Sequence, residues 1–163
     1  MCKSVNKIYK VTMITEDYIS FETAELLKEK GFDENCAALY HLRTGKIIQQ
    51  GVGYVFKNSQ WENFVSAPTL QMAMKWLREV HNILLVVDYE YECDTTPYYF
   101  KIYRLGENGK PERVTIKGVL YDKDNNATEH IVGYRDWERS YGDYSTYEEA
   151  CEESIKYCLK NLI

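Results

Sequence analysis

Hydrophobic residues recur with helical spacing in three stretches of the chain. The clearest is the range Ser66–Ile83. Its apolar residues share one side of the expected helix: Leu70, Met72, Ala73, Met74, Trp76, Leu77 and Val80. A stripe this wide predicts a buried central helix that contacts more than one neighbour. Ser66 is expected to cap its first turn, and Asn82 to end it in the left-handed conformation.

The other two helical stretches carry clear end signals. The range Phe21–Lys30 follows Ser20, a good N-cap residue, and is followed by Gly31, which suits a left-handed helix end. Near the end of the chain, Thr146 and Glu149 have the spacing of a capping box. The residues after it that share one side of the predicted helix are expected to be buried: Tyr147, Ala150, Cys151, Ser154, Ile155, Cys158, Leu159 and Leu162.

Between these helices, short apolar or alternating runs bounded by turn residues predict strands. The expected strands are Lys7–Ile14, Cys36–Leu42, Lys46–Lys57, Ile83–Val87, Tyr98–Leu105, Arg113–Tyr121 and Glu129–Arg135. Tight turns between successive strands favour antiparallel pairing. The chain is therefore predicted to be a single α+β domain over residues 1–163. It has three helices on a mainly antiparallel sheet, in the order β-α-β-β-α-β-β-β-β-α.

Composition and charge narrow the class of protein. The 163 residues are 45% hydrophobic and 28% charged, which is ordinary for a soluble globular domain. No apolar run approaches the ~20 residues of a membrane span, and the first residues lack a signal-peptide pattern, so we expect a cytoplasmic protein with no membrane partner. Residues 1–82 carry ten Lys and Arg against nine Asp and Glu, whereas residues 83–163 carry ten against sixteen. This acidic second half argues against a nucleic-acid partner.

No recognisable catalytic or metal-binding pattern occurs in the sequence. The five cysteines form no C-x-x-C pair, so we expect buried reduced thiols. His41, His81 and His130 are far apart and show no metal-ligand spacing, and His81 is expected to hydrogen-bond carbonyl groups at the end of its helix. We therefore expect no cofactor, no metal and no enzymatic activity.

The fifteen tyrosines are the unusual feature of the composition, and many fall in the second half. Tyrosine suits half-buried sheet faces, which is the simpler explanation. It is also enriched in protein interfaces, because it offers a large and rigid contact area. The segment before the last helix, which contains Trp137, Arg139 and Tyr141, has the composition of an interface hot spot. Tyr89 and Tyr91 are further candidates.

Three stretches, Tyr18–Asp33, Ser66–Ile83 and Thr146–Ile163, resemble a group of short, uncharacterised proteins encoded by Bacteroides-type gut bacteria and their phages. They cover about a third of the chain and correspond to its three predicted helices. The resemblance implies a phage or prophage accessory protein of unknown role. The resemblance implies no activity and identifies no site residues for this chain.

These observations favour a non-catalytic binding or accessory protein. It would engage a protein partner through a tyrosine-rich surface, or associate with itself as a small homo-oligomer. The alternative is a small-molecule binder, such as a protein that sequesters a nucleotide signal of host defence. That function requires basic and aromatic side chains around one pocket, for which Arg78, Arg135 and Arg139 are the candidates.

Overall fold

The structure of the protein is a computed structural model. It describes residues 16–49, 54–89, 91, 97–106, 108, 110–114, 116–121, 127–132 and 144–163, with the backbone alone for 116–121 and 127–132. The helices are α1 (Phe21–Glu29), α2 (Leu70–His81) and α3 (Tyr147–Asn161), with a 3-10 turn at Asn58–Gln60. The strands are β1 (Ala38–His41), β2 (Ile47–Gln49), β3 (Phe64–Ser66), β4 (Ile83–Tyr89), β5 (Tyr98–Leu105), β6 (Pro111–Arg113), β7 (Ile116–Tyr121) and β8 (Ala127–Val132).

The α+β class and the order of the elements agree with the prediction from the sequence. Every described strand pairing is antiparallel, and the strands divide among three sheets, ordered β2-β1-β3, β4-β5-β6 and β7-β8. The expected strand Arg113–Tyr121 is divided between β6 and β7. The expected strand Lys7–Ile14 lies outside the described residues.

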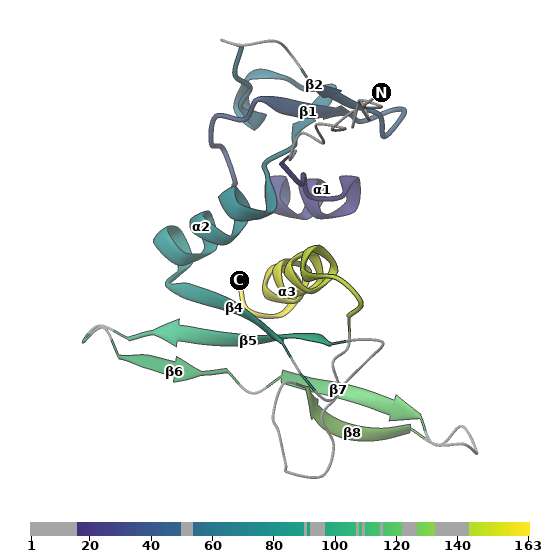
Figure 1. Cartoon of the computed structure of the whole chain (residues 1–163). Coiled ribbons are helices and arrows are strands. Elements are labelled where there is room, and N and C mark those ends of the chain that lie inside the picture. The colour runs from purple at the N-terminus through teal and green to yellow at the C-terminus, as the bar shows by residue number, and fades with distance from the viewer. Residues whose placement is uncertain are drawn as a thin grey trace, which may run out of the picture.

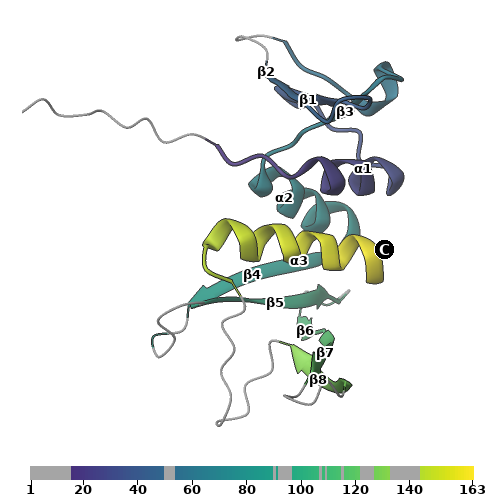
Figure 2. The same cartoon turned by 90° about the vertical axis from the view of Figure 1, so that its right-hand side faces the viewer.

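The elements stack in layers. The β2-β1-β3 sheet lies at one end, α1 and α2 lie beneath it, and α3 lies between these helices and the β4-β5-β6 sheet (Figures 1 and 2). The helix α3 contacts α1, α2, β4 and β5. Its buried side is mainly apolar, with Ser154 as the one polar residue among those described: Ala150, Cys151, Ser154, Ile155, Cys158 and Leu159. The core therefore forms around α3, which joins the two ends of the molecule.

Most of the predicted helix ends are confirmed. The Ser20 hydroxyl accepts a hydrogen bond from the Thr23 N–H, and Gly31 has a φ of 87°. Asn82 ends α2 with a φ of 56°, and the capping box of Thr146 and Glu149 is present. These signals are local, which explains why the sequence was sufficient to predict them.

The prediction for the start of α2 is wrong. Thr69 is the N-cap residue and accepts from the Met72 N–H at 3.3 Å, whereas Ser66 is the last residue of β3. Pro68 disfavours helical backbone at the residue before it, so the helix starts only after the proline. Val80 also departs from expectation because its side chain is 55% exposed. It lies on the apolar side of α2, but no element covers the last turn there.

Three of the five cysteines, Cys36, Cys151 and Cys158, are described, and each is a buried free thiol, as expected. Burial raises their pKa values to about 12, about 11 and about 12. A thiol must be deprotonated to act as a nucleophile, so these three are inert at neutral pH.

Candidate interaction surface

Four tyrosines form a continuous cluster where β4, β5 and α3 meet. We call Tyr89, Tyr91, Tyr98 and Tyr147 the tyrosine surface. The Tyr89 ring lies edge-on to those of Tyr91 and Tyr98, with centroid separations of 5.5 and 5.3 Å, and the Tyr98 ring lies edge-on to Tyr147 at 6.3 Å. This is the preferred geometry of aromatic pairs. Tyr89, Tyr91 and Tyr147 are 46%, 90% and 37% exposed, so the cluster faces solvent.

Backbone pairing fixes the positions of Tyr89 and Tyr98 in this cluster. Tyr89 and Tyr98 are opposite each other in the β4–β5 register. Tyr98 also exchanges two backbone hydrogen bonds of 3.1 Å with Tyr144, which lies just before α3. The Tyr144 ring stacks on the buried Phe100 with a centroid separation of 5.8 Å. The tyrosine surface therefore rests on a sheet, a helix start and the core.

An Asp88 network supports the β4 end of this surface. The Asp88 carboxylate accepts from the Lys101 ammonium at 2.7 Å, from the Tyr99 hydroxyl at 3.0 Å and from the Tyr89 N–H at 2.9 Å. The Lys101 hydrogen bond and those from the Tyr89 N–H and Tyr99 lower the pKa of Asp88 to about 2. Asp88 consequently stays ionised in neutral solution and holds β4 and β5 together beside the exposed rings.

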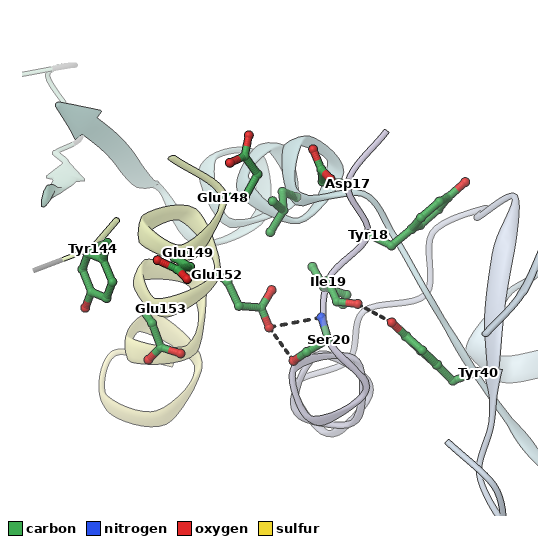
Figure 3. Close-up of a pocket in the computed structure, with 11 residues that line it drawn as sticks. Asp17, Tyr18, Ile19, Ser20, Tyr40, Tyr144, Glu148, Glu149, Glu152 and Glu153 are labelled. Atoms are coloured by element: carbon green, nitrogen blue, oxygen red, sulfur yellow. Dashed lines mark hydrogen bonds between the residues drawn. The ribbon is translucent and has the colours of Figure 1, made fainter. Parts of the chain in front are cut away.

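Tyr144 is one of the residues that line a cleft of about 530 Å³ (Figure 3). The backbone hydrogen bonds between Tyr144 and Tyr98 connect this cleft to the tyrosine surface. The cleft lies between the segment before α1, the start of α2 and one side of α3. Its charged lining residues are all acidic: Asp17, Glu148, Glu149, Glu152 and Glu153. The aromatic residues in its wall are Tyr18, Tyr40 and Tyr144. We call it the acidic cleft.

Three of these carboxylates already have structural partners. Glu152 accepts from the Ser20 N–H at 3.1 Å and from the hydroxyls of Ser20 and Thr23, which joins α3 to the start of α1. Glu149 belongs to the capping box, and hydrogen bonds from Ser145 lower its pKa. Glu153 pairs with Lys156 at 3.0 Å.

The remaining two carboxylates of the acidic cleft, those of Asp17 and Glu148, form no ion pair within the described part of the chain. Both residues are exposed. Because the charged lining residues of the cleft are all acidic and, among the described residues, only Glu152 and Glu153 lie within ion-pair distance of a lysine, Lys156, this edge of the cleft favours cations over phosphate groups.

The structure describes three of the site residues predicted from the sequence. Tyr89 and Tyr91 belong to the tyrosine surface. Arg78 is exposed on α2, beside Glu79 at 3.6 Å. Arg78 lies in the last turn of α2, which leads into the start of β4, whereas Tyr89 is the last residue of β4. The strand itself is roughly 20 Å long at ~3.3 Å per residue. The other predicted residues lie outside the described residues: Arg135, Trp137, Arg139 and Tyr141.

Sequence reasoning missed Tyr147 and the acidic cleft. Tyr147 was expected on the buried side of the last helix, but it is the first residue of α3 and extends beyond the core. The spacing of Glu148, Glu149, Glu152 and Glu153 was a usable signal, because it places these carboxylates on one side of the helix. The residues that complete the cleft come from distant parts of the chain.

The described part of the chain contains no group of three or more His, Cys, Asp or Glu residues that could hold a metal ion. None of the helices described is long and apolar enough to cross a membrane. The His81 Nε2 is buried without a hydrogen-bond partner, contrary to the expected contact with a carbonyl group, and its ring packs on Trp76 with a centroid separation of 4.5 Å.

Comparisons with protein-family models, curated proteins and solved structures find no match to this chain. The resemblance of the three helices to phage and Bacteroides proteins stays a prediction.

Proposed function

We propose that this is a non-catalytic binding protein that engages a protein partner through the tyrosine surface. The observation that carries the proposal is the chain of edge-to-face contacts from Tyr91 through Tyr89 and Tyr98 to Tyr147. As part of the proposal, the protein acts in the cytoplasm and is encoded by a phage or prophage. This origin is supported by the resemblance of its helices.

A protein partner suits this surface better than a small ligand does. The rings of Tyr89, Tyr91 and Tyr147 are exposed on the outside of the molecule. The backbone positions of Tyr89 and Tyr98 are fixed by strand pairing and by Tyr144. A fixed aromatic surface loses little conformational entropy when a partner covers it, and buried tyrosines contribute strongly to binding in known interfaces.

Among the described residues, no observation favours the nucleotide-binding alternative. Arg78 lies at the opposite end of β4 from Tyr89. The acidic cleft next to the tyrosine surface carries carboxylates, which disfavour a phosphate group. We therefore propose the protein partner and not the nucleotide.

The proposal is tested with the double variant Tyr89→Ala/Tyr91→Ala. Wild-type chain is immobilised to capture partners from an extract, and the binding of each captured protein is then measured by interferometry. We expect the double variant to weaken this binding by at least about ten-fold, since these two exposed rings are the outer half of the surface.

Val80→Ala is the matched control. Val80 is also an exposed apolar residue, but it lies on α2, away from the tyrosine surface. Its substitution should leave binding unchanged, and thermal melting should show that all variants are folded. If the partners bind the tyrosine variant as tightly as they bind the wild type, the proposal is wrong.

A further inference from the structure

A second exposed apolar surface lies on the β2-β1-β3 sheet and the loop beside it. We define the Trp61 surface by its exposed apolar residues Tyr54, Val55 and Trp61. Tyr54 and Val55 directly precede Phe56, which contacts Trp61. Trp61 is 48% exposed, and its ring lies edge-on to Phe56 and Phe64, with centroid separations of 6.4 and 6.1 Å. Exposed apolar residues gathered in one place are typical of interaction sites.

The strand register explains why part of this surface has no internal partner. Tyr40 of β1 is opposite Val65 of β3, and the Tyr40 ring packs on Phe21 of α1 at 5.5 Å. The next pair, His41 and Phe64, must point to the other side of the sheet. Their rings are 5.1 Å apart, and Phe64 continues the aromatic contacts to Trp61. The helix α1 therefore covers one side of the sheet, and the aromatic residues lie on the other.

The charge beside the Trp61 surface is opposite to that of the acidic cleft. Arg43 and Lys46 are exposed at the turn between β1 and β2, and neither side chain forms an ion pair within the described part of the chain. Glu62, next to Trp61, is also exposed, so these two basic residues outnumber one acidic residue. The first half of the sequence has a slight excess of basic residues, whereas the second half is acidic. The basic residues beside the Trp61 surface would therefore be attracted to the carboxylates beside the tyrosine surface.

We infer that the Trp61 surface of one copy binds the tyrosine surface of a second copy, head to tail. The inference rests on the proposed function and names the partner of the tyrosine surface. Trp61 meets the exposed tyrosines, while Arg43 and Lys46 face the carboxylates of Asp17 and Glu148. Aromatic residues would form the centre of this interface and charges its rim, which is the usual arrangement.

The complementarity favours a head-to-tail contact over a two-fold dimer. Pairing either surface with itself would bring like charges together, which is unfavourable. In a head-to-tail contact each added copy leaves one surface of each kind free, so the assembly grows with concentration into a ring or an open chain.

Two variants, each with one surface disrupted, test this inference. Arg43→Glu/Lys46→Glu reverses the charge beside the Trp61 surface and leaves the tyrosine surface intact. Tyr89→Ala/Tyr91→Ala disrupts the tyrosine surface and leaves the Trp61 surface and the charge beside it intact. Mass is followed by size exclusion with light scattering as concentration rises. We expect the wild type to grow in mass, and each variant alone to associate at least about ten-fold more weakly.

An equimolar mixture of the two variants is the decisive measurement. The intact tyrosine surface of one variant meets the intact Trp61 surface of the other, so we expect a 1:1 dimer that grows no further. A mixture that stays monomeric overturns the inference. A wild type that stops at a two-fold dimer also overturns it.

A charge-swapped chain tests the ionic contacts. We expect Arg43→Glu/Lys46→Glu/Asp17→Lys/Glu148→Lys to regain the self-association that the first two substitutions remove. No recovery would overturn the assigned charge pairing. If the wild type stays monomeric at every concentration, the inference fails, and the extract-capture experiment independently decides whether the tyrosine surface binds another protein.

Discussion

Two carboxylates hold neighbouring parts of the molecule in different ways. Glu152 of α3 accepts hydrogen bonds from Ser20 and Thr23, which are more than 100 residues away in the sequence. Its side chain is 16% exposed. Asp88 accepts hydrogen bonds from donors on its own strand and on the adjacent strand, and its side chain is 46% exposed. Glu152 therefore fixes the tertiary arrangement around the acidic cleft, whereas Asp88 stabilises the local pairing beneath the tyrosine surface.

We expect burial and sequence distance to decide the stabilising effect of these two carboxylates, because their hydrogen bonds are equal in number. Both carboxylates accept three. Water competes weakly for the hydrogen bonds of Glu152, because its partner Thr23 is fully buried. Water competes strongly for those of the more exposed Asp88. Substitution of Glu152 should consequently affect the whole domain, and substitution of Asp88 should act locally.

The largest expected effect is that of Glu152→Ala. It removes the acceptor for three donors at the start of α1, and the buried Thr23 hydroxyl loses that partner. We expect the free energy of unfolding to fall by roughly 1–3 kcal/mol, measured by urea denaturation. The matched control is Glu153→Ala on the same helix, whose 45% exposed carboxylate pairs with Lys156. It should cost at most about 1 kcal/mol. Equal losses in the two variants would contradict the role given to Glu152.

The next effect concerns acid stability at Asp88. The Lys101 hydrogen bond is the largest cause that lowers the folded-state pKa of Asp88, from 3.8 to about 2. The stabilising contribution is therefore present above pH ~4 and is lost as pH falls from ~4 to ~2. We expect the melting temperature of Asp88→Asn to fall less than that of the wild type across this interval. Identical pH profiles would show that Asp88 does not stabilise the sheet.

The smallest effect is expected at His81, a polar group without a partner. Burial lowers its folded-state pKa below 6.5. The unfolded chain therefore binds the proton more readily, and stability is lost as pH falls through about 6.5. His81→Phe keeps a ring beside Trp76 and removes the titration. We expect it to be as stable as the wild type or more so at pH 7, with a flatter melting profile between pH 7 and 5. Marked destabilisation at pH 7 would indicate a required polar contact.

The helices could be predicted from the sequence because their signals are short-range. Apolar spacing, caps and the left-handed residues Gly31 and Asn82 act within a few residues, and the structure confirms them. Strand identity was also accessible, since β4 and β5 are apolar runs between turns. The start of α2 was mistaken because Ser66 suits a cap equally well, and only its pairing with Leu39 places it in a strand.

The candidate site was only partly visible in the sequence. Tyrosine content pointed to the second half, but nothing in the order of residues placed Tyr147 beside Tyr98. The glutamates of α3 share a visible spacing, yet their cleft requires Asp17 and Tyr18 from the other end of the chain. Long-range neighbours of this kind depend on how α3 packs, and no local pattern specifies that.

The sequence by itself determined the α+β class, the order of the elements, most helix ends and the burial of the three described thiols. Each of these follows from local backbone preference or from hydrophobicity. Only the tertiary structure decided that the strands divide into separate sheets and that Val80 is exposed. It alone also placed the tyrosine surface beside the acidic cleft, and Arg43 and Lys46 on the sheet that carries the Trp61 surface. These features depend on which side chains meet across the core, and that is settled by the packing of whole elements.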